Sequence, residues 1–241
     1  MKNKIQFPFF LTVIALSILS ITSCKNAGDK SELAVSADTT AMSADTVTSF
    51  EPFKVFSVSH TVKDFDAWKK VYDEGEGMRI EAGMTKLAVC RDMDNPNKVY
   101  VFNKIADVEK AKGFAADPKL KEAMQKGGVT GTPVMLYVDV VRFEESPAEN
   151  KDRLRVGHKV KDFDAWLKVY DAEGKETRAE NGLVDRAISR NIDDPNIIYV
   201  TFAISDLAKA KARLADPALK KIMTEAGVIG APETYFYSSV D

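Results

Sequence analysis

The sequence HTVKDFDAW at residues 60–68 occurs a second time as HKVKDFDAW at residues 158–166, an offset of 158 − 60 = 98. Both copies continue to Val-Tyr-Asp, at 71–73 and 169–171. Further along the offset becomes 99, because the second copy carries one extra residue before its next matching segment. Two copies are too few for a solenoid, so the repeat predicts a duplicated domain or a fused dimer.

Each copy has a mixed pattern of strands and helices. Residues 54–62 alternate and are rich in β-branched side chains, which predicts a strand. Asp64 is a good N-cap, and the aromatic residues that follow it recur on one face of a helix. The remaining expected elements of the first copy are the continuation of that helix to near Gly83, strands at 84–91 and 98–104, a helix from Asp107, a short helix from Asp117-Pro118 and a last strand at 133–142. The order β-α-β-β-α-α-β predicts a ferredoxin-like α+β unit with one added helix.

The domain boundaries follow from the repeat. We expect one unit at 53–145 and a second at 152–241, joined by a short polar segment from Glu144 to Lys151. A four-stranded sheet with helices on one side leaves its other face uncovered, and the second copy offers the missing cover. The sequence therefore predicts two tandem ferredoxin-like domains that form a pseudo-dimer within one chain, and a monomer in solution.

The two copies resemble the dimeric α+β barrel superfamily, close to small bacterial proteins of the "cyclase" and antibiotic-biosynthesis-monooxygenase-like kind. The motifs that carry the resemblance in the first copy are His-x-Val-x-Asp-Phe-x-x-Trp at 60–68, Arg-x-x-x-Gly at 79–83, Arg-x-x-Asp-Asn-Pro-Asn at 91–97, Asp-Pro-x-Leu-Lys-x-x-Met at 117–124 and Gly-Val-x-Gly-x-Pro at 128–133. The resemblance implies two sheets paired into a barrel, and a cavity between sheet and helices. Haem-degrading relatives place a His on a helix with a cooperating Asn and Trp, whereas here both His residues end a strand, which argues against haem chemistry.

The first residues indicate export. Lys2 and Lys4 precede an apolar stretch at 5–21, and Ile-Thr-Ser-Cys24 resembles a bacterial lipobox. We expect a lipoprotein signal peptide at 1–23, lipidation of Cys24, and a flexible tether at 24–52. We expect this lipid to anchor the protein to a membrane of the cell envelope. The outer membrane or the cell surface is expected rather than the inner membrane. The alternative is an uncleaved membrane anchor.

Charge and cysteine content exclude other classes. The formal net charge of −2 lacks the basic excess of a nucleic-acid binder, so no nucleic acid is expected as partner. If Cys24 carries lipid, Cys90 is the one remaining thiol and no intrachain disulfide can form. Cys90 lies in an expected strand, where a small, partly buried residue is a simpler interpretation than a nucleophile.

The candidate catalytic residues are the two histidines and two arginines. His60 and His158 occupy the same repeat position and could act as bases; alternatively, each hydrogen-bonds the following turn and caps the helix entry. Arg79 and Arg178 could hold a carboxylate or enolate, or could pair with local acids such as Asp94 or Asp193.

Aromatic residues and a second arginine pair are the expected cavity lining. These residues are Trp68, Trp166, Tyr72, Tyr170, Arg91 and Arg190. An aromatic stripe at helical spacing is also what an ordinary core contains. No cluster has the spacing of metal ligands, so neither a metal nor a cofactor is expected.

These features leave three functions open. The leading hypothesis is a lipid-anchored, extracytoplasmic protein that binds a small, mostly apolar molecule in a barrel cavity. The first alternative is a cofactor-independent monooxygenase or cyclase-like enzyme with a His base and an Arg that stabilises an anion. The second is a structural or interaction module without a ligand. Whether the protein is an enzyme is left open, because fold alone does not choose among these.

Overall fold

The computed structural model describes residues 50–144 and 150–240. Contacts divide the chain into a unit at 1–47 and a unit at 48–241, and the described residues belong to the second. The expected signal peptide, Cys24 and most of the expected tether lie outside the described residues. Among the described residues, no helix has both the length and the apolar character that crossing a bilayer requires.

The two halves of this unit have the same element order. The first half contains β1 (Phe53–Val62), α1 (Phe65–Glu74), α2 (Glu76–Glu81), β2 (Met84–Asp92), β3 (Lys98–Ile105), α3 (Val108–Ala116), α4 (Pro118–Lys126) and β4 (Val129–Phe143). The second half contains β5 (Asp152–Val160), α5 (Phe163–Glu173), α6 (Lys175–Glu180), β6 (Leu183–Asn191), β7 (Ile197–Ile204), α7 (Leu207–Ala215), α8 (Pro217–Glu225) and β8 (Val228–Ser239). The order is β-α-α-β-β-α-α-β in each half.

Aspartates set the starts of the helices. Asp64 accepts a hydrogen bond at 2.7 Å from the backbone N–H of Ala67, and Asp162 does the same for Ala165. Each bond satisfies one of the N–H groups that a helix leaves without an internal partner. Pro118 stands at the start of α4, where its missing N–H costs nothing. The predicted helix starts are therefore confirmed.

Two predicted boundaries are wrong. The single helix expected from Asp64 to near Gly83 is broken at Gly75, which ends α1 and precedes α2. The last strand begins at Val129 rather than at residue 133, because Gly131 adopts a φ of +70° and lets the chain pair with β1 ahead of Pro133. The register shift between Ser59 and Thr61 of β1 marks the same irregularity.

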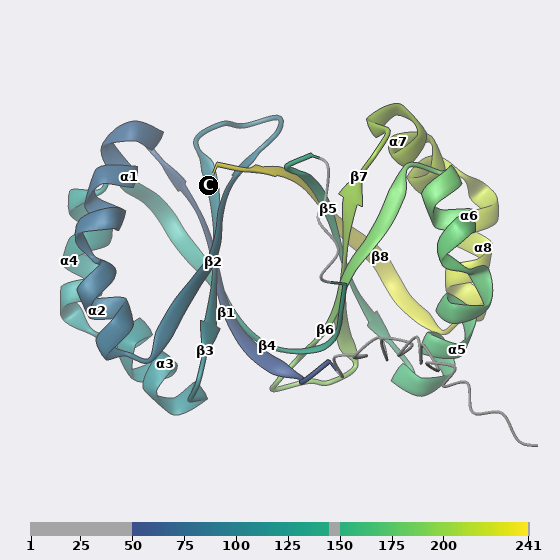
Figure 1. Ribbon diagram of the computed structural model, residues 1–241, viewed down its shortest axis with the longest axis horizontal. Coiled ribbons are helices and arrows are strands. Elements are labelled where there is room, and N and C mark those ends of the chain that lie inside the picture. Colours follow the sequence, from purple (N-terminus) through teal and green to yellow (C-terminus); the bar gives the residue numbers. More distant parts are fainter. Residues whose placement is uncertain (1–49, 145–149, 241) are drawn as a thin grey trace, which may run out of the picture. The chain divides into compact units, whose positions relative to one another are not determined.

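The strands close into one barrel in the order β1-β3-β2-β8-β5-β7-β6-β4 (Figure 1). The halves meet at two seams of different length. At one seam, β4 pairs with β6 from Val138↔Asn191 to Phe143↔Ala187. At the other, β2 pairs with β8 through only three residue pairs, from Cys90↔Ser239 to Asp92↔Tyr237. The expected intrachain pairing of two ferredoxin-like sheets is confirmed.

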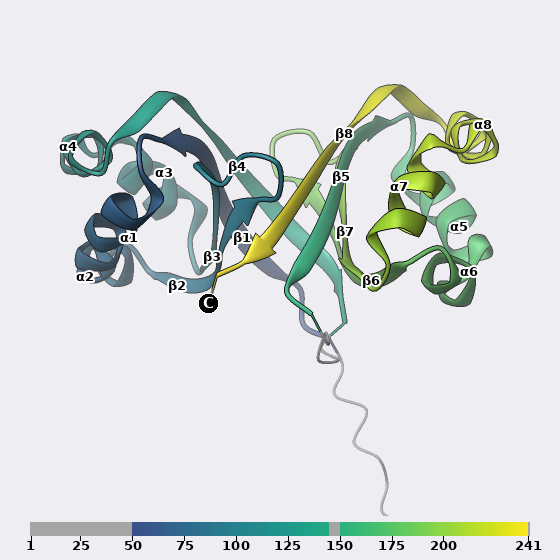
Figure 2. The same ribbon diagram turned by 90° about the horizontal axis from the view of Figure 1, so that it is seen from above.

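The helices cover the outside of this barrel on two opposite sides (Figures 1 and 2). Helices α1–α4 lie over the strands of the first half and α5–α8 over those of the second. Because side chains alternate along a strand, each strand sends one set outward to its helices and the other set into the barrel. On β5, for example, Leu154 packs in the core under the helices, whereas Arg153 and Arg155 line a cavity inside the barrel.

Candidate functional site

Each half encloses a cavity between its sheet and its helices. The cavity of the second half has a volume of about 90 Å³ and that of the first half about 80 Å³, and both are partly open to solvent. The first cavity is lined mainly by β1, β3, α1, α2 and α4, and the second by the equivalent elements of its own half. The walls are mostly apolar in both.

The aromatic stripe of the first helix in each half lines these cavities. Trp68 and Tyr72 stack with their ring centroids 5.0 Å apart, and Trp166 and Tyr170 stack at 5.2 Å. All four side chains contribute to the cavity walls, and the two tryptophans are also buried members of the core. The structure therefore places these residues where the helical spacing predicts, with core packing and cavity lining combined in the same side chains.

A histidine faces each cavity from the end of the first strand. His60 on β1 is buried, and its ring meets the edge of Trp68 at 5.5 Å between centroids. His158 on β5 meets Trp166 in the same way at 5.7 Å. Neither nitrogen of either ring has a hydrogen-bond partner among the described residues.

The absence of hydrogen bonds among the described residues corrects one of the two interpretations of the histidines, namely that each ring fixes the following turn. A histidine that fixed the following turn would donate to it or accept from it, and no such bond is present in residues 50–144 and 150–240. The aspartates Asp64 and Asp162 cap the helices instead. Burial lowers the pKa of both His60 and His158 from 6.5 to about 4, so both rings are neutral at pH 7. Each neutral ring offers one N–H donor and one acceptor to the cavity.

The arginines of the two cavities differ in their partners. Arg79 lies 3.8 Å from the ring centroid of Tyr72 and donates to the Tyr72 carbonyl oxygen at 2.7 Å. Arg178 makes the equivalent contacts with Tyr170, at 3.9 Å and 2.7 Å, but also pairs with two carboxylates. The Nε and Nη2 atoms of Arg178 donate to the two carboxylate oxygens of Asp185 at 2.8 and 2.7 Å, and its Nη1 lies 3.5 Å from a carboxylate oxygen of Glu173.

The sequence explains this difference between the halves. Asp185 corresponds to 185 − 99 = 86 in the first half, and residue 86 is a lysine. In the first half a lysine therefore occupies the position of the carboxylate that neutralises Arg178, and no ion pair of Arg79 is found in the described part of the chain. Neither Asp94 nor Asp193, the acids expected as local partners, pairs with these arginines in residues 50–144 and 150–240.

A second difference between the two copies of the repeat adds to the polarity of the first cavity. Asn103 on β3 is buried in its wall, and its Oδ1 has no hydrogen-bond partner among the described residues. The equivalent residue of the second half is 103 + 99 = 202, which is Phe202 in the wall of the second cavity. The first cavity thus presents an imidazole, an amide oxygen and an arginine without a carboxylate. The second presents an imidazole and two arginines, Arg178 and Arg213, that carboxylates neutralise.

Arg91 and Arg190, expected as lining residues, are placed elsewhere and do not line either cavity. The Nε of Arg91 donates to the Pro96 carbonyl oxygen at 2.7 Å, and its guanidinium lies 4.1 Å from the ring centroid of Phe65. Arg190 repeats both contacts with Pro195 and Phe163. Each side chain therefore fastens the turn that contains this proline to the start of the first helix of its half.

Metal ligands do not assemble near these sites. Within residues 50–144 and 150–240, no three His, Cys, Asp or Glu side chains come together in a way that could hold a metal ion. Cys90 is buried on β2, and its side chain lines the interior of the barrel rather than either helix-side cavity.

Comparison with known proteins identifies the fold. No family model matches the sequence, and no curated protein matches it. Among solved structures, an anthrone oxidase-like protein superposes with a TM-score of 0.55 at 14% identity, over 78% of this chain and 92% of its own. A protein provisionally named a monooxygenase, from Fusobacterium nucleatum, superposes with a TM-score of 0.52 at 12% identity, over 78% and 93%. The chain therefore has the ferredoxin-like, dimeric α+β barrel fold that the sequence predicts.

Proposed function

We propose that the chain is a lipid-anchored protein of the cell envelope, at the outer membrane or cell surface, that binds a small, mostly apolar molecule in the two cavities between sheet and helices. The binding part of this proposal rests on one observation that is the same in both halves: a neutral imidazole with no hydrogen-bond partner among the described residues faces a mostly apolar cavity. A buried polar group is costly without a hydrogen bond, and a bound hydroxyl or carbonyl group would supply it.

The cavities limit what can bind. At about 80 and 90 Å³ they are smaller than the roughly 150 Å³ apolar cavity that holds benzene in an engineered protein. A single ring with one hydroxyl group is therefore close to the upper size for the enclosed space, and a larger ligand would extend through the solvent opening. The stacked Trp and Tyr rings favour a flat, apolar ligand.

Binding of phenol and toluene to the purified full chain tests the proposal, because the two molecules differ by the hydroxyl group. The chain's two tryptophans each line one cavity, so tryptophan fluorescence reports these sites directly. We expect phenol to bind about 5- to 10-fold more tightly than toluene, as one hydrogen bond allows. A His60→Phe/His158→Phe variant should lose this preference while keeping the ring volume, and His60→Asn/His158→Asn should retain part of it. Unchanged fluorescence with both probes would contradict the proposal.

One observation in the first half supports the alternative that the protein is an enzyme. His60, Asn103 and Arg79 together supply a base, a hydrogen-bonding group and a cation, which are the minimum parts for removing a proton and stabilising the anion. A pKa of about 4 makes His60 a weak base, which argues against efficient proton removal at neutral pH. Consumption of dioxygen with anthrone, an enolisable ketone, tests this alternative. Turnover that His60→Asn reduces by about 10²–10⁴-fold and His158→Asn leaves intact would favour the enzyme.

A further inference from the structure

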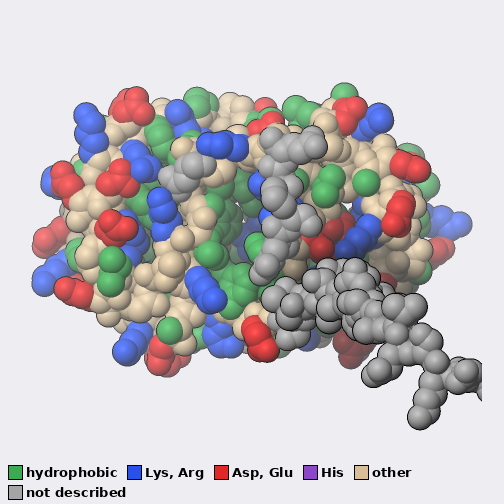
Figure 3. All heavy atoms as spheres, in the orientation of Figure 1, with side chains coloured by type: hydrophobic (Ala, Val, Ile, Leu, Met, Phe, Trp, Pro, Cys, Tyr) green, Lys and Arg blue, Asp and Glu red, His purple; other side chains and the backbone are tan. Residues whose placement is uncertain are grey.

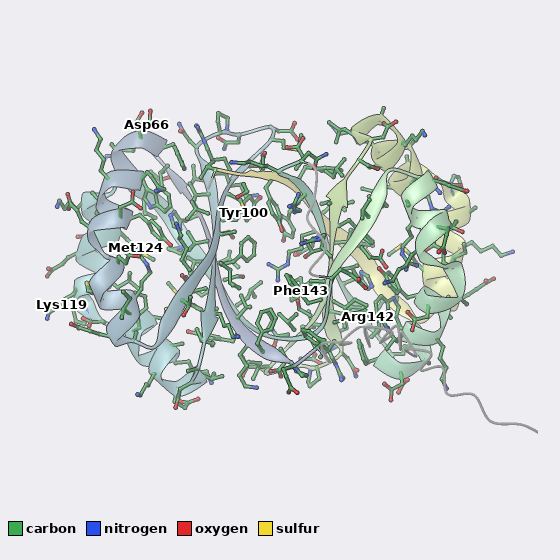
Figure 4. All side chains as sticks on the ribbon, in the orientation of Figure 1. Asp66, Tyr100, Lys119, Met124, Arg142 and Phe143 are labelled. Atoms are coloured by element: carbon green, nitrogen blue, oxygen red, sulfur yellow. The ribbon has the colours of Figure 1, made fainter. Side chains whose placement is uncertain are left out.

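The interior of the barrel contains a third cavity, which is larger than the two cavities under the helices. Its volume is about 340 Å³, and its walls come from strands of both halves. Figure 3, drawn from the same side as Figure 1, shows hydrophobic side chains together with some Lys and Arg side chains around the hollow between the halves. Tyr100 and Phe143 point into the space that the strands enclose, whereas Arg142 lies outside it (Figure 4).

Arg155 on β5 is buried in the wall of this cavity. The residue is 8% exposed, and one guanidinium nitrogen lies 3.5 Å from the Oγ of Ser57. That long contact is its one hydrogen bond within the described residues, although a guanidinium carries five N–H donors. The groups whose charges act on it most strongly are four tyrosines and no acid, namely Tyr237, Tyr199, Tyr235 and Tyr100. Burial lowers the pKa of this guanidinium.

The Arg155 side chain is held in place by an aromatic ring. Its guanidinium lies 4.1 Å from the centroid of Tyr199. Tyr199 in turn lies against Gly157, where a Cβ atom would come within 2.9 Å of the ring, so only glycine leaves room for it. Such a cation–π contact recovers only part of the free energy that burial of an unpaired ion costs, so the stacked ring orients the charge without neutralising it.

Two more arginines extend the positive character of the cavity. Arg153 and Arg186 also contribute to its wall, and no Asp or Glu of the described residues does. Burial lowers the pKa of Arg186, and the like charge of Arg153 lowers it further, against the opposing effect of Glu144. The rest of the wall is mostly apolar, with Val55, Phe102 and Val138 among its members.

We propose that the barrel interior is a further binding site, distinct from the two helix-side cavities. It takes a monocarboxylic acid with an apolar body and holds the carboxylate on Arg155. A planar guanidinium pairs with a carboxylate through two parallel hydrogen bonds, and the apolar walls accommodate the rest of the molecule. At about 30 Å³ per water molecule, the cavity holds the volume of roughly eleven waters, which suits a phenyl ring on a short aliphatic acid. The site is independent of the helix-side cavities, because its walls lie on the opposite face of the strands.

The test compares 4-phenylbutyrate with 4-phenylbutan-1-ol, which has the same apolar body and no charge. Both are titrated into the purified full chain by calorimetry. We expect the acid to bind about 10- to 100-fold more tightly than the alcohol, as a charge-assisted pair allows. Arg155→Met keeps the length of the side chain and should weaken binding of the acid by the same factor while leaving the alcohol unchanged. The control is Arg142→Met, which removes an arginine outside the barrel and should leave both affinities unchanged.

Fluorescence separates this proposal from the helix-side function. Both tryptophans line the cavities under the helices and none lines the barrel interior, so binding at Arg155 should leave their fluorescence nearly constant. If phenol leaves the tryptophan fluorescence unchanged while 4-phenylbutyrate still binds, only the proposal for the helix-side cavities is refuted. Equal affinity for acid and alcohol, no binding of the acid, or equal affinity of wild type and Arg155→Met for the acid would each overturn the site in the barrel.

Discussion

Arg155 and Ser57 occupy the same position of the repeat, since 155 − 98 = 57, and they meet each other inside the barrel at 3.5 Å. Equivalent residues of two halves touch only near the axis that relates the halves. Two arginines at this position would place two buried like charges side by side, which is strongly unfavourable. Because the halves belong to one chain, one half supplies the cation and the other supplies a small hydroxyl group beside it.

The first prediction concerns the stability cost of that cation. Replacing Arg155 by Met removes a buried charge that no carboxylate of the described residues neutralises, and keeps an apolar side chain of similar length. We expect the ligand-free protein to gain about 1 kcal/mol or more in free energy of unfolding. For a chain of this size that corresponds to a rise in Tm of about 2–4 °C per kcal/mol. Scanning calorimetry of the variant beside Arg142→Met measures it; a lower Tm in Arg155→Met would refute this account.

The second prediction concerns the neutralised arginine of the second half. Arg178 is 4% exposed and depends on Asp185, which is 8% exposed, for its main ion pair. Asp185→Asn would leave the guanidinium buried with only the more distant Glu173, so we expect a loss of about 3 kcal/mol in free energy of unfolding. The matched control is Asp139→Asn, which breaks an exposed pair with Lys54 and should cost under about 1 kcal/mol. Urea denaturation compares the two, and equal losses would contradict the prediction.

The third prediction concerns pH. The pKa of His60 and of His158 is about 4 in the folded protein and about 6.5 when unfolded, so the unfolded state binds more protons between these values. Stability should therefore fall as the pH drops from 6.5 toward 4, by about 2 kcal/mol per histidine at pH 5. The double variant His60→Asn/His158→Asn should lose this part of the slope. Urea midpoints at pH 7.5 and pH 5 measure it; the same slope in the variant would show that other groups cause the loss.

The fourth prediction concerns the lipid anchor, which the sequence alone supports. Cys24→Ser removes the thiol that a lipoprotein diacylglyceryl transferase modifies, so the signal peptide should remain attached and a palmitate analogue should no longer label the protein. Cys90→Ser is the matched control, because it removes the other thiol, which is buried inside the barrel. Electrophoretic mobility and metabolic labelling report the result, and continued labelling of Cys24→Ser would contradict the anchor.

The repeat and its helix caps made the architecture predictable. Asp64, Asp107 and Asp117 each precede a helix, and the matching aspartates of the second half do the same, so the starts of the elements could be inferred locally. The break at Gly75 was missed, although Gly75 recurs as Gly174 and marks the same helix junction in both halves. A glycine in an otherwise helical pattern is often tolerated, so its position alone does not predict a break.

The candidate sites were predictable only where a residue type recurs. The histidines and the aromatic stripe appear in both copies, and the structure brings them to the walls of the two cavities. Arg155 appears in one copy only and was missed. Two features could have indicated it. One is that the equivalent residue of the first copy is Ser57, and the other is that Arg153 and Arg155 alternate with buried residues along β5. Which face of a strand lies inside a closed barrel depends on pairing between distant strands, which local pattern does not contain.

The unequal seams of the barrel have a kinetic consequence. Three residue pairs join β2 to β8, whereas five pairs join β4 to β6. A seam with fewer paired residues opens locally at a smaller cost in free energy than a longer one. Amide hydrogens that bond across the shorter seam, such as those of Met93 and Val240, should therefore exchange with deuterium ahead of the amides of the longer seam. Separation of these two strands would widen the interior cavity, whose wall includes Cys90 and Tyr237.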